Sequence, residues 1–138
     1  MTLDVLFRIT DLEVISVSSS RDGAHEPQVN WFVDYAPQKE DELDARVIMA
    51  TLHVAGSVGR GDIQVGALLW DGSGATQNDE SFEAAFAESD ALEMLYDFAR
   101  VSLRSVLAIV ESDADAPGQS PRPEIGQLSR VDNAESVV

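Results

Sequence analysis

The chain has 138 residues, a formal net charge of −16 at pH 7 and no cysteine, which suits one domain with a modest core and excludes disulfides and thiolate metal sites. The excess of 25 acidic over 9 basic residues argues against nucleic acid binding, because a basic face is needed to replace the counterions around phosphates. The opening MTLDVLFRITDLEV carries acids early and alternates, so we expect no secretion signal, no membrane insertion and a cytoplasmic location.

The first half of the chain predicts an antiparallel sheet. Alternating apolar residues predict a strand over Leu3–Val17, with a bulge at Thr10-Asp11 where the alternation changes parity. A second strand is predicted over Gln28–Ala36, which is rich in aromatic and β-branched residues. The third, Ala45–Val58, has apolar residues on both parities, which indicates a central strand covered on both faces.

A hairpin is predicted after the third strand. Gly59–Asp62 has the glycines and polar pair of a tight turn, and Ile63–Trp70 returns as an antiparallel fourth strand. A short helix is then predicted over Glu80–Glu88, capped by Asn78 or Asp79. Its Phe82 and Phe86 stand one turn apart and should anchor it.

Ala91–Glu111 is the longest periodic run and predicts a long helix, with Asp90 and Glu93 forming a capping box at its start. One apolar face has helical spacing and comprises Leu92, Leu95, Tyr96, Ala99, Leu103, Val106, Leu107 and Val110. A second apolar row runs beside it and comprises Met94, Phe98, Val101, Ser105 and Ile109. A surface helix needs one apolar face for its own domain, so the second row suggests another subunit or a bound apolar ligand. The alternative is that both rows fill one core.

The last residues differ in composition from the rest. Ser112–Val138 holds three of the five prolines and few aromatic residues, and we expect a mobile acidic tail after a folded domain of residues 1–111. Within this tail, Ile125, Leu128 and Val131 have the spacing of a short docked turn.

The sequence lacks the patterns of an active site. His25 and His53 are isolated, and there is no nucleophile elbow and no glycine-rich cofactor loop. We therefore expect neither an enzyme nor a cofactor or metal.

The order and lengths of these elements resemble the SecB family of export chaperones over Leu6–Glu111. Leu95-Tyr96-Asp97-Phe98-Ala99-Arg100 is similar to the Leu-Tyr/Phe-Pro-Tyr-Ala/Ile-Arg opening of that family's long helix, and Phe7-Arg8-Ile9 followed by Asp11-Leu12 is similar to its first strand. The resemblance implies an α+β fold, with a four-stranded antiparallel sheet packed against a short and a long C-terminal helix.

The chain departs from the family pattern at Asp97, where proline is common, and at Val101, where glutamate is common. These departures favour a divergent SecB-like chaperone, of the kind that bacteria pair with a toxin–antitoxin system or that phages carry.

The resemblance implies an ATP-independent holdase that binds unfolded or nascent polypeptides in apolar grooves and assembles as a homotetramer, a dimer of dimers. A SecA-like motor or an antitoxin would be a further partner. Flexible and aromatic side chains suit a surface that accepts many clients. On this basis the predicted client-binding residues are Phe7, Ile9, Leu12 and Val14 of the first strand, Trp31 and Phe32 of the second, and Met94, Phe98 and Val101 of the long helix.

Two other functions fit the sequence. One is a phage or plasmid regulator that binds a single folded partner through its acidic face. The other is a small-ligand module, which predicts a monomer or dimer with an enclosed cavity.

Overall fold

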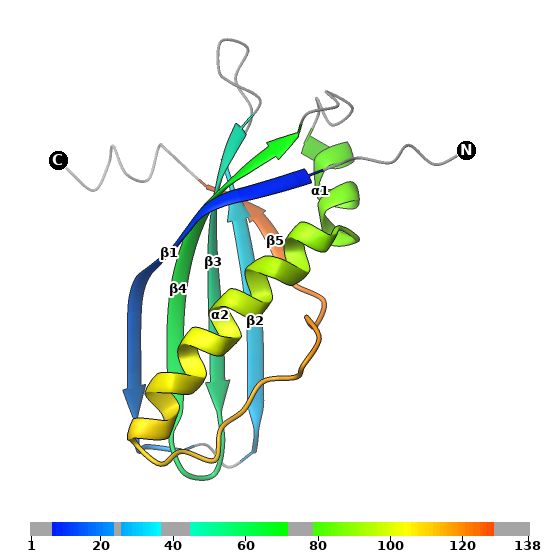
Figure 1. Cartoon of the computed structure of the whole chain (residues 1–138). Coiled ribbons are helices and arrows are strands. Elements are labelled where there is room, and N and C mark those ends of the chain that lie inside the picture. The colour runs from blue at the N-terminus through cyan, green and yellow to red at the C-terminus, as the bar shows by residue number, and fades with distance from the viewer. Residues whose placement is uncertain (1–6, 24–25, 37–44, 72–78, 129–138) are drawn as a thin grey trace, which may run out of the picture.

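Figure 1 shows a computed structural model of the chain, which describes residues 7–23, 26–36, 45–71 and 79–128. His25, Asn78 and Val131 lie outside these residues, as do the start of the predicted first strand and the end of the predicted tail. The elements are β1 (Phe7–Ser20), β2 (Gln28–Tyr35), β3 (Ala45–Ala55), β4 (Arg60–Asp71), α1 (Asp79–Ala87), α2 (Asp90–Ile109) and β5 (Glu124–Gln127).

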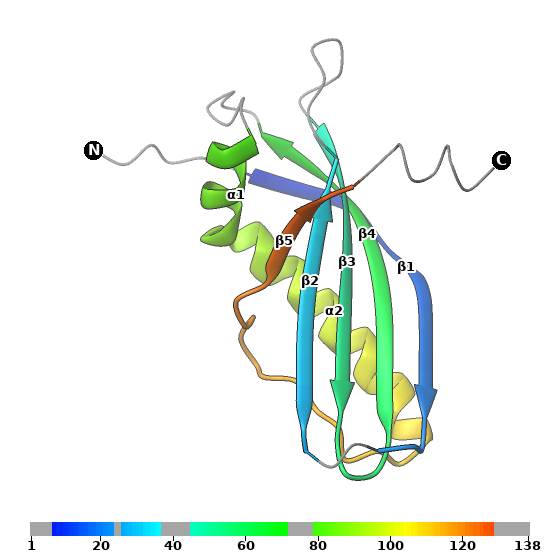
Figure 2. The same cartoon turned by 180° about the vertical axis from the view of Figure 1, so that it is seen from behind.

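One sheet, with strand order β1-β4-β3-β2-β5, carries the long helix α2 on a single face (Figures 1 and 2). The four long strands pair antiparallel, and β3 lies at the centre of the sheet as predicted. These strands and the two helices confirm the predicted α+β fold. The sequence did not predict β5, which pairs parallel with β2 and closes that edge of the sheet.

β1 changes direction along its length (Figure 1). Its register against β4 shifts between Thr10 and Glu13, and Asp11 has a φ of 57°, which confirms the predicted bulge. A second shift lies between Val14 and Ser16. These two irregularities decide which β1 side chains share the face that α2 covers.

The turn between β3 and β4 lies earlier in the chain than predicted. The Gly56 N–H donates to the Gly59 carbonyl oxygen (3.0 Å), and Gly59 has a φ of 93°. β4 then begins at Arg60, so the prediction of a turn over Gly59–Asp62 was wrong. The reason is that Gly59 supplies the left-handed conformation that closes the turn, so the residues after it are free to pair with β3.

The core lies between α2 and the sheet. The buried side chains of α2 are Ala91, Leu92, Leu95, Tyr96, Ala99, Leu103 and Leu107, and all but Ala91 belong to the first predicted apolar face. They cover the inner residues of β2, β3 and β4, which are also buried. Met94, Val101 and Ile109 of the second row are exposed. The alternative that the two rows together fill one core is therefore wrong.

Aromatic side chains attach α1 to one end of this core. Phe82 and Phe86 are fully buried and stack on each other with ring centroids 5.6 Å apart. Phe7 meets both rings edge-on, and the guanidinium of Arg46 lies 4.2 Å from the centre of the Phe82 ring. These contacts confirm the predicted anchoring role of the two phenylalanines.

The N-cap of α2 is Ser89. Its hydroxyl accepts from the Leu92 N–H (3.2 Å) and donates to the Phe86 carbonyl oxygen (2.8 Å). The prediction of a capping box at Asp90 was wrong, because Asp90 already has helical backbone and the Glu93 carboxylate accepts from Ser120 N–H instead. Asp90 and Glu93 lie in the first turn, where acids favour the helix dipole.

Ser89→Ala should lower the free energy of unfolding by about 1 kcal/mol, because the Leu92 N–H then loses its acceptor. Urea denaturation of both proteins measures this change. Asp90→Asn is the matched control and should cost less, since it removes only a charge at the exposed helix start. If Asp90→Asn lowered the free energy of unfolding by as much as Ser89→Ala or more, Asp90 would be the N-cap instead.

Candidate functional site

The two sides of α2 have different surroundings. Glu93 and Tyr96 face residues 112–123, here called the strap, which runs from the end of α2 to β5 (Figures 1 and 2). β5 pairs with β2, so the strap follows the β2 side of the helix. By helical geometry Met94, Phe98 and Val101 lie on the opposite side, toward β1.

Apolar residues of β1 continue this side of the helix. Val14 pairs with Val65 and Val17 pairs with Ile63, and paired residues of an antiparallel sheet share a face. Val65 and Ile63 are buried in the core, so Val14 and Val17 belong to the face that carries α2. We call the combined surface the apolar strip. Its members are Met94, Phe98, Val101 and Ile109 of α2 with Leu12, Val14 and Val17 of β1.

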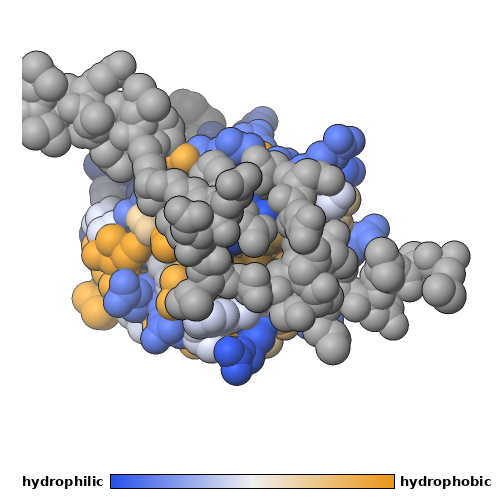
Figure 3. All heavy atoms as spheres, turned by 90° about the horizontal axis from the view of Figure 1, so that it is seen from above, coloured by the Kyte–Doolittle hydropathy of each residue, from blue (hydrophilic) through white to orange (hydrophobic). Residues whose placement is uncertain are grey.

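Much of the apolar strip is open. Met94 is 53% exposed, Val101 54% and Ile109 80%, while Val14 and Val17 are just over 40% exposed. Leu12 and Phe98 are half-buried and join the strip to the core. Figure 3, viewed from above, shows hydrophobic surface gathered on the left, the side on which β1 and the end of α2 lie in Figure 1. Clustered exposed apolar residues are typical of an interaction surface.

A second apolar surface lies on the opposite face of the sheet. Phe32 and Val47 are exposed there, and Met49, Leu68 and Trp70 are half-buried. Arg8 lies over the Trp70 ring, 5.4 Å from its centre. No helix of the described residues covers this face (Figure 2).

The structure therefore divides the predicted client-binding residues into three groups. Leu12, Val14, Met94, Phe98 and Val101 come together in the apolar strip. Phe32 lies on the opposite face of the sheet. The third group comprises Ile9 and Trp31, which are buried in the core, and Phe7, which packs against the α1 rings. Client binding by all nine residues stays a prediction.

Val17 and Ile109 are members of the strip that the predicted site omitted. Ile109 belonged to the second apolar row of the helix, so its spacing was a usable signal. Val17 had no such signal, because the second register shift, between Val14 and Ser16, decides which face it joins.

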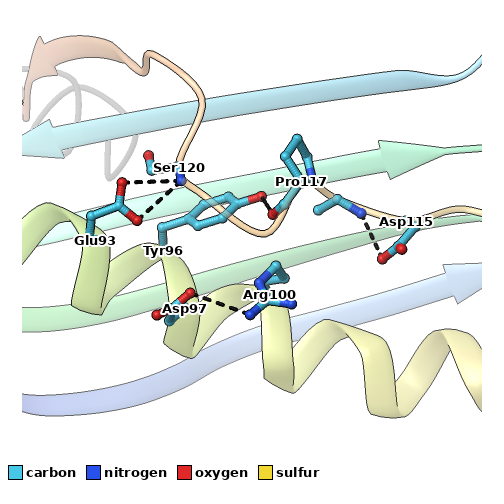
Figure 4. A network of polar contacts seen from close by, with 8 residues as sticks. Glu93, Tyr96, Asp97, Arg100, Asp115, Pro117 and Ser120 are labelled. Atoms are coloured by element: carbon cyan, nitrogen blue, oxygen red, sulfur yellow. Dashed lines mark hydrogen bonds and ion pairs between the residues drawn. The ribbon is translucent and has the colours of Figure 1, made fainter.

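Polar contacts hold the strap against α2 (Figure 4). The Tyr96 hydroxyl donates to the Pro117 carbonyl oxygen (2.5 Å), and the Glu93 carboxylate accepts from Ser120 N–H (3.2 Å). Burial raises the pKa of Tyr96 to about 12, while the nearby Arg100 opposes this rise. The hydroxyl therefore stays protonated as a donor at neutral pH. The division into a domain of residues 1–111 and a mobile tail stays a prediction.

Asp113 attaches the beginning of the strap to the β3–β4 turn. Its carboxylate accepts from Val58 N–H (2.7 Å), Ser57 N–H (3.2 Å) and the Ser57 hydroxyl. The hydrogen bond from Ser57 is the main cause that lowers the pKa of Asp113, followed by the one from Val58. These hydrogen bonds fix the end of α2 beside the turn.

This attachment should depend on pH. The lowered pKa of Asp113 means that its contribution to stability is present above the ordinary value of 3.8 and is lost as pH falls through the lowered folded value. Asp113→Asn should therefore speed amide exchange at Val58 at neutral pH, measured by NMR, and the difference from wild type should vanish in strong acid.

Asp115→Asn is the control, because the Asp115 carboxylate accepts from Ala116 N–H within the strap. Equal exchange at Val58 in the wild type and Asp113→Asn at pH 7 would contradict the attachment.

A cavity of about 530 Å³ separates part of the strap from the helices. Ala84 and Ala87 of α1 and Leu92 of α2 form its apolar wall, while residues 120–123 of the strap form the other side. Glu88 and Glu93 add carboxylates. The strap is thus fixed at its contacts and loosely packed between them.

The described residues offer little to a metal. No group of three or more His, Cys, Asp and Glu side chains among them is arranged to hold an ion. His53 Nδ1 hydrogen-bonds to Asp62 Oδ1 across β3 and β4, a partner that local sequence spacing did not reveal. Within the same residues, no helix has both the length and the apolar character needed to cross a bilayer.

No protein-family model matches the sequence, and no curated protein matches it by sequence. Among solved structures, the fold is similar to that of the Mycobacterium tuberculosis Rv1957 SecB-like chaperone in complex with a ChAD peptide from the Rv1956 HigA1 antitoxin. The TM-score is 0.59 at 15% sequence identity, over 85% of this chain and 92% of that chain. The fold of this chain is thus SecB-like.

Proposed function

We propose that this chain, with its SecB-like fold, is an ATP-independent cytoplasmic holdase that binds unfolded or nascent polypeptides. The observation that carries this proposal is the apolar strip along α2 and β1, much of which is exposed on the part of the chain that the structure describes. Burying apolar surface is worth about 25 cal/mol per Å² whatever the sequence that supplies it. A surface of flexible and branched apolar side chains such as Met94, Val101 and Ile109 can therefore hold many non-native segments.

Assembly as a homotetramer, a dimer of dimers, is part of the proposal. β1 is 14 residues long and lies at an edge of the sheet, and its outer side has no pairing strand among the described residues. Such edges are templates for pairing with another chain. A second copy on this edge would extend the sheet and also bring a second apolar strip next to the first. Clients and neighbouring copies would then share the exposed surface of α2.

A dedicated client is the narrower form of the proposal. The M. tuberculosis protein of similar fold is seen in complex with a peptide from an antitoxin. We propose an antitoxin as one client of this chain and a SecA-like motor as the partner if the role is in export. The net charge of −16 favours partners with basic segments in either case.

An aggregation assay tests the proposed function. Several unrelated denatured proteins are diluted into buffer with or without the full-length chain, and light scattering is followed. We expect suppression of scattering for most of them without ATP. No suppression of any, together with tight binding to one native target, would instead support a regulator that binds a folded partner through its acidic face.

A further inference from the structure

We propose that β5 is an exchangeable strand, and that an extended segment of another polypeptide takes its place on the edge of β2. The segment enters parallel to β2 and has an apolar residue, then a basic one, then a residue with a polar end. This inference rests on the proposed function, which identifies the other polypeptide as a client. It adds the place at which one client segment binds and the direction in which that segment runs.

The first support is that few contacts keep β5 on the sheet. It has only four residues, and its parallel register joins Phe32–Tyr35 to Glu124–Gln127. The Leu128 N–H extends the ladder by donating to the Tyr35 carbonyl oxygen (2.8 Å). Strands this short at a sheet edge contribute little burial, and such segments open locally more often than the core. β2 without β5 would present a row of free backbone groups, as in other cases of β-strand addition.

The second support is the contact between Asp34 and Gly126. A Cβ added at Gly126 would lie 2.9 Å from Asp34 Oδ1, so β5 passes close over this carboxylate. Burial raises the pKa of Asp34, which shows that its charged form loses solvation here. A segment with Lys or Arg at this position would bring a cation to the carboxylate, at the cost of a small movement of the Asp34 side chain.

The third support is the poor fit of the strap that leads to β5. The pocket of about 530 Å³, which is open to solvent, is lined on one side by residues 120–123 and on the other by the two helices. In addition, Trp31 Nε1 and Arg100 Nε are buried and have no hydrogen-bond partner among the described residues. Both adjoin Tyr96: the Trp31 ring meets its ring at 5.4 Å, and Arg100 is one turn further along α2. Buried donors without acceptors are costly, so another chain that supplies acceptors here would gain affinity.

These contacts define the segment that fits. Ile125 pairs with the buried Val33 and packs against the core, so this position selects an apolar residue. Gln127 pairs with Tyr35 and donates to its hydroxyl (3.3 Å). A residue whose side chain ends in a polar group therefore suits this position. The position between them faces Asp34 and selects a basic residue. The acidic chain as a whole favours such a segment.

The test uses two full-length variants that receive the same substitution. Gly126→Asp places a second carboxylate against Asp34 and should release β5. Gly118→Asp is the matched control in the strap, because an added Cβ there has no neighbour within 4 Å. The probes are synthetic peptides that copy residues 117–128, with Lys or Asp at the position of Gly126, and a carboxymethylated protein that stays unfolded.

We expect the Lys peptide to bind Gly126→Asp about tenfold or more tightly than it binds Gly118→Asp or wild type, because the edge of β2 is then free more often. It should also bind Gly126→Asp more tightly than the Asp peptide does, and Asp34→Asn added to that variant should erase the preference. The carboxymethylated protein should compete with the Lys peptide.

Equal peptide affinity for all three proteins would overturn the exchange of β5. Peptide binding without competition by the unfolded protein would overturn the assignment of this edge to clients. Failure of the aggregation assay would remove the proposed function and with it the client, while the peptide measurements would still decide whether β5 exchanges.

Discussion

Val101→Asp should remove most of the ability of the chain to hold unfolded proteins, raising the Kd for a carboxymethylated client about tenfold or more. Val101 is 54% exposed near the middle of the apolar strip, so the fold tolerates a polar side chain there. A partner that covers the strip must then bury a carboxylate without a counterion, and this desolvation weakens binding far more than the loss of the valine methyl groups does. Phe98 is half-buried and would confound binding with folding.

Arg104→Ala is the matched control for this variant. It changes the net charge by the same one unit on the exposed polar side of α2. Circular dichroism should show both variants folded, and fluorescence anisotropy of the labelled client should show weaker binding only for Val101→Asp. Sedimentation of the same samples shows whether copies of the chain or clients cover the strip. Unchanged client affinity and unchanged mass would exclude the strip as a binding surface.

Phe82→Ala should lower the free energy of unfolding by about 3–5 kcal/mol, which is a large part of the stability of a domain this size. The Phe82 ring is fully buried among Phe7, Tyr35 and Phe86, with centroid distances of 4.7 to 5.7 Å. Its removal leaves a cavity, and it also removes the ring on which the guanidinium of Arg46 packs. α1 should detach, because this ring is one of its two buried anchors.

Urea denaturation measures this loss, and hydrogen exchange along residues 80–87 shows whether α1 detaches before the core unfolds. Glu80→Gln is the control on the same helix, since Glu80 is exposed and should change the stability by less than about 1 kcal/mol. A loss for Phe82→Ala no larger than for Glu80→Gln would mean that α1 is not held by its aromatic anchors.

Periodicity was sufficient to predict the main elements. The two apolar rows of α2 differ by their angle around the helix axis, and the structure buries most of the first row and leaves Met94, Val101 and Ile109 of the second exposed. β3 was predicted as central from apolar residues on both parities, and it lies between β2 and β4. Patterns of this kind depend on local spacing, which the sequence shows directly.

Features that depend on distant contacts were not predictable in the same way. Pro-Glu-Ile-Gly-Gln at residues 123–127 has weak strand propensity, and β5 forms because the edge of β2 is available beside it. Trp31 and Phe32 are adjacent in β2 and so lie on opposite faces, but which of the two is buried depends on where α2 packs. The Ser89 cap is different, because its contact with the Leu92 N–H is only three residues away and was a local signal.

The mass of the unmodified full-length chain in solution tests most directly whether the apolar strip belongs to an assembly. Sedimentation equilibrium at micromolar concentration should give about 60 kDa, four times the 14.9 kDa of one chain. A mass of 14.9 kDa, with Val14, Met94 and Val101 exposed on a lone subunit, would contradict the proposed assembly.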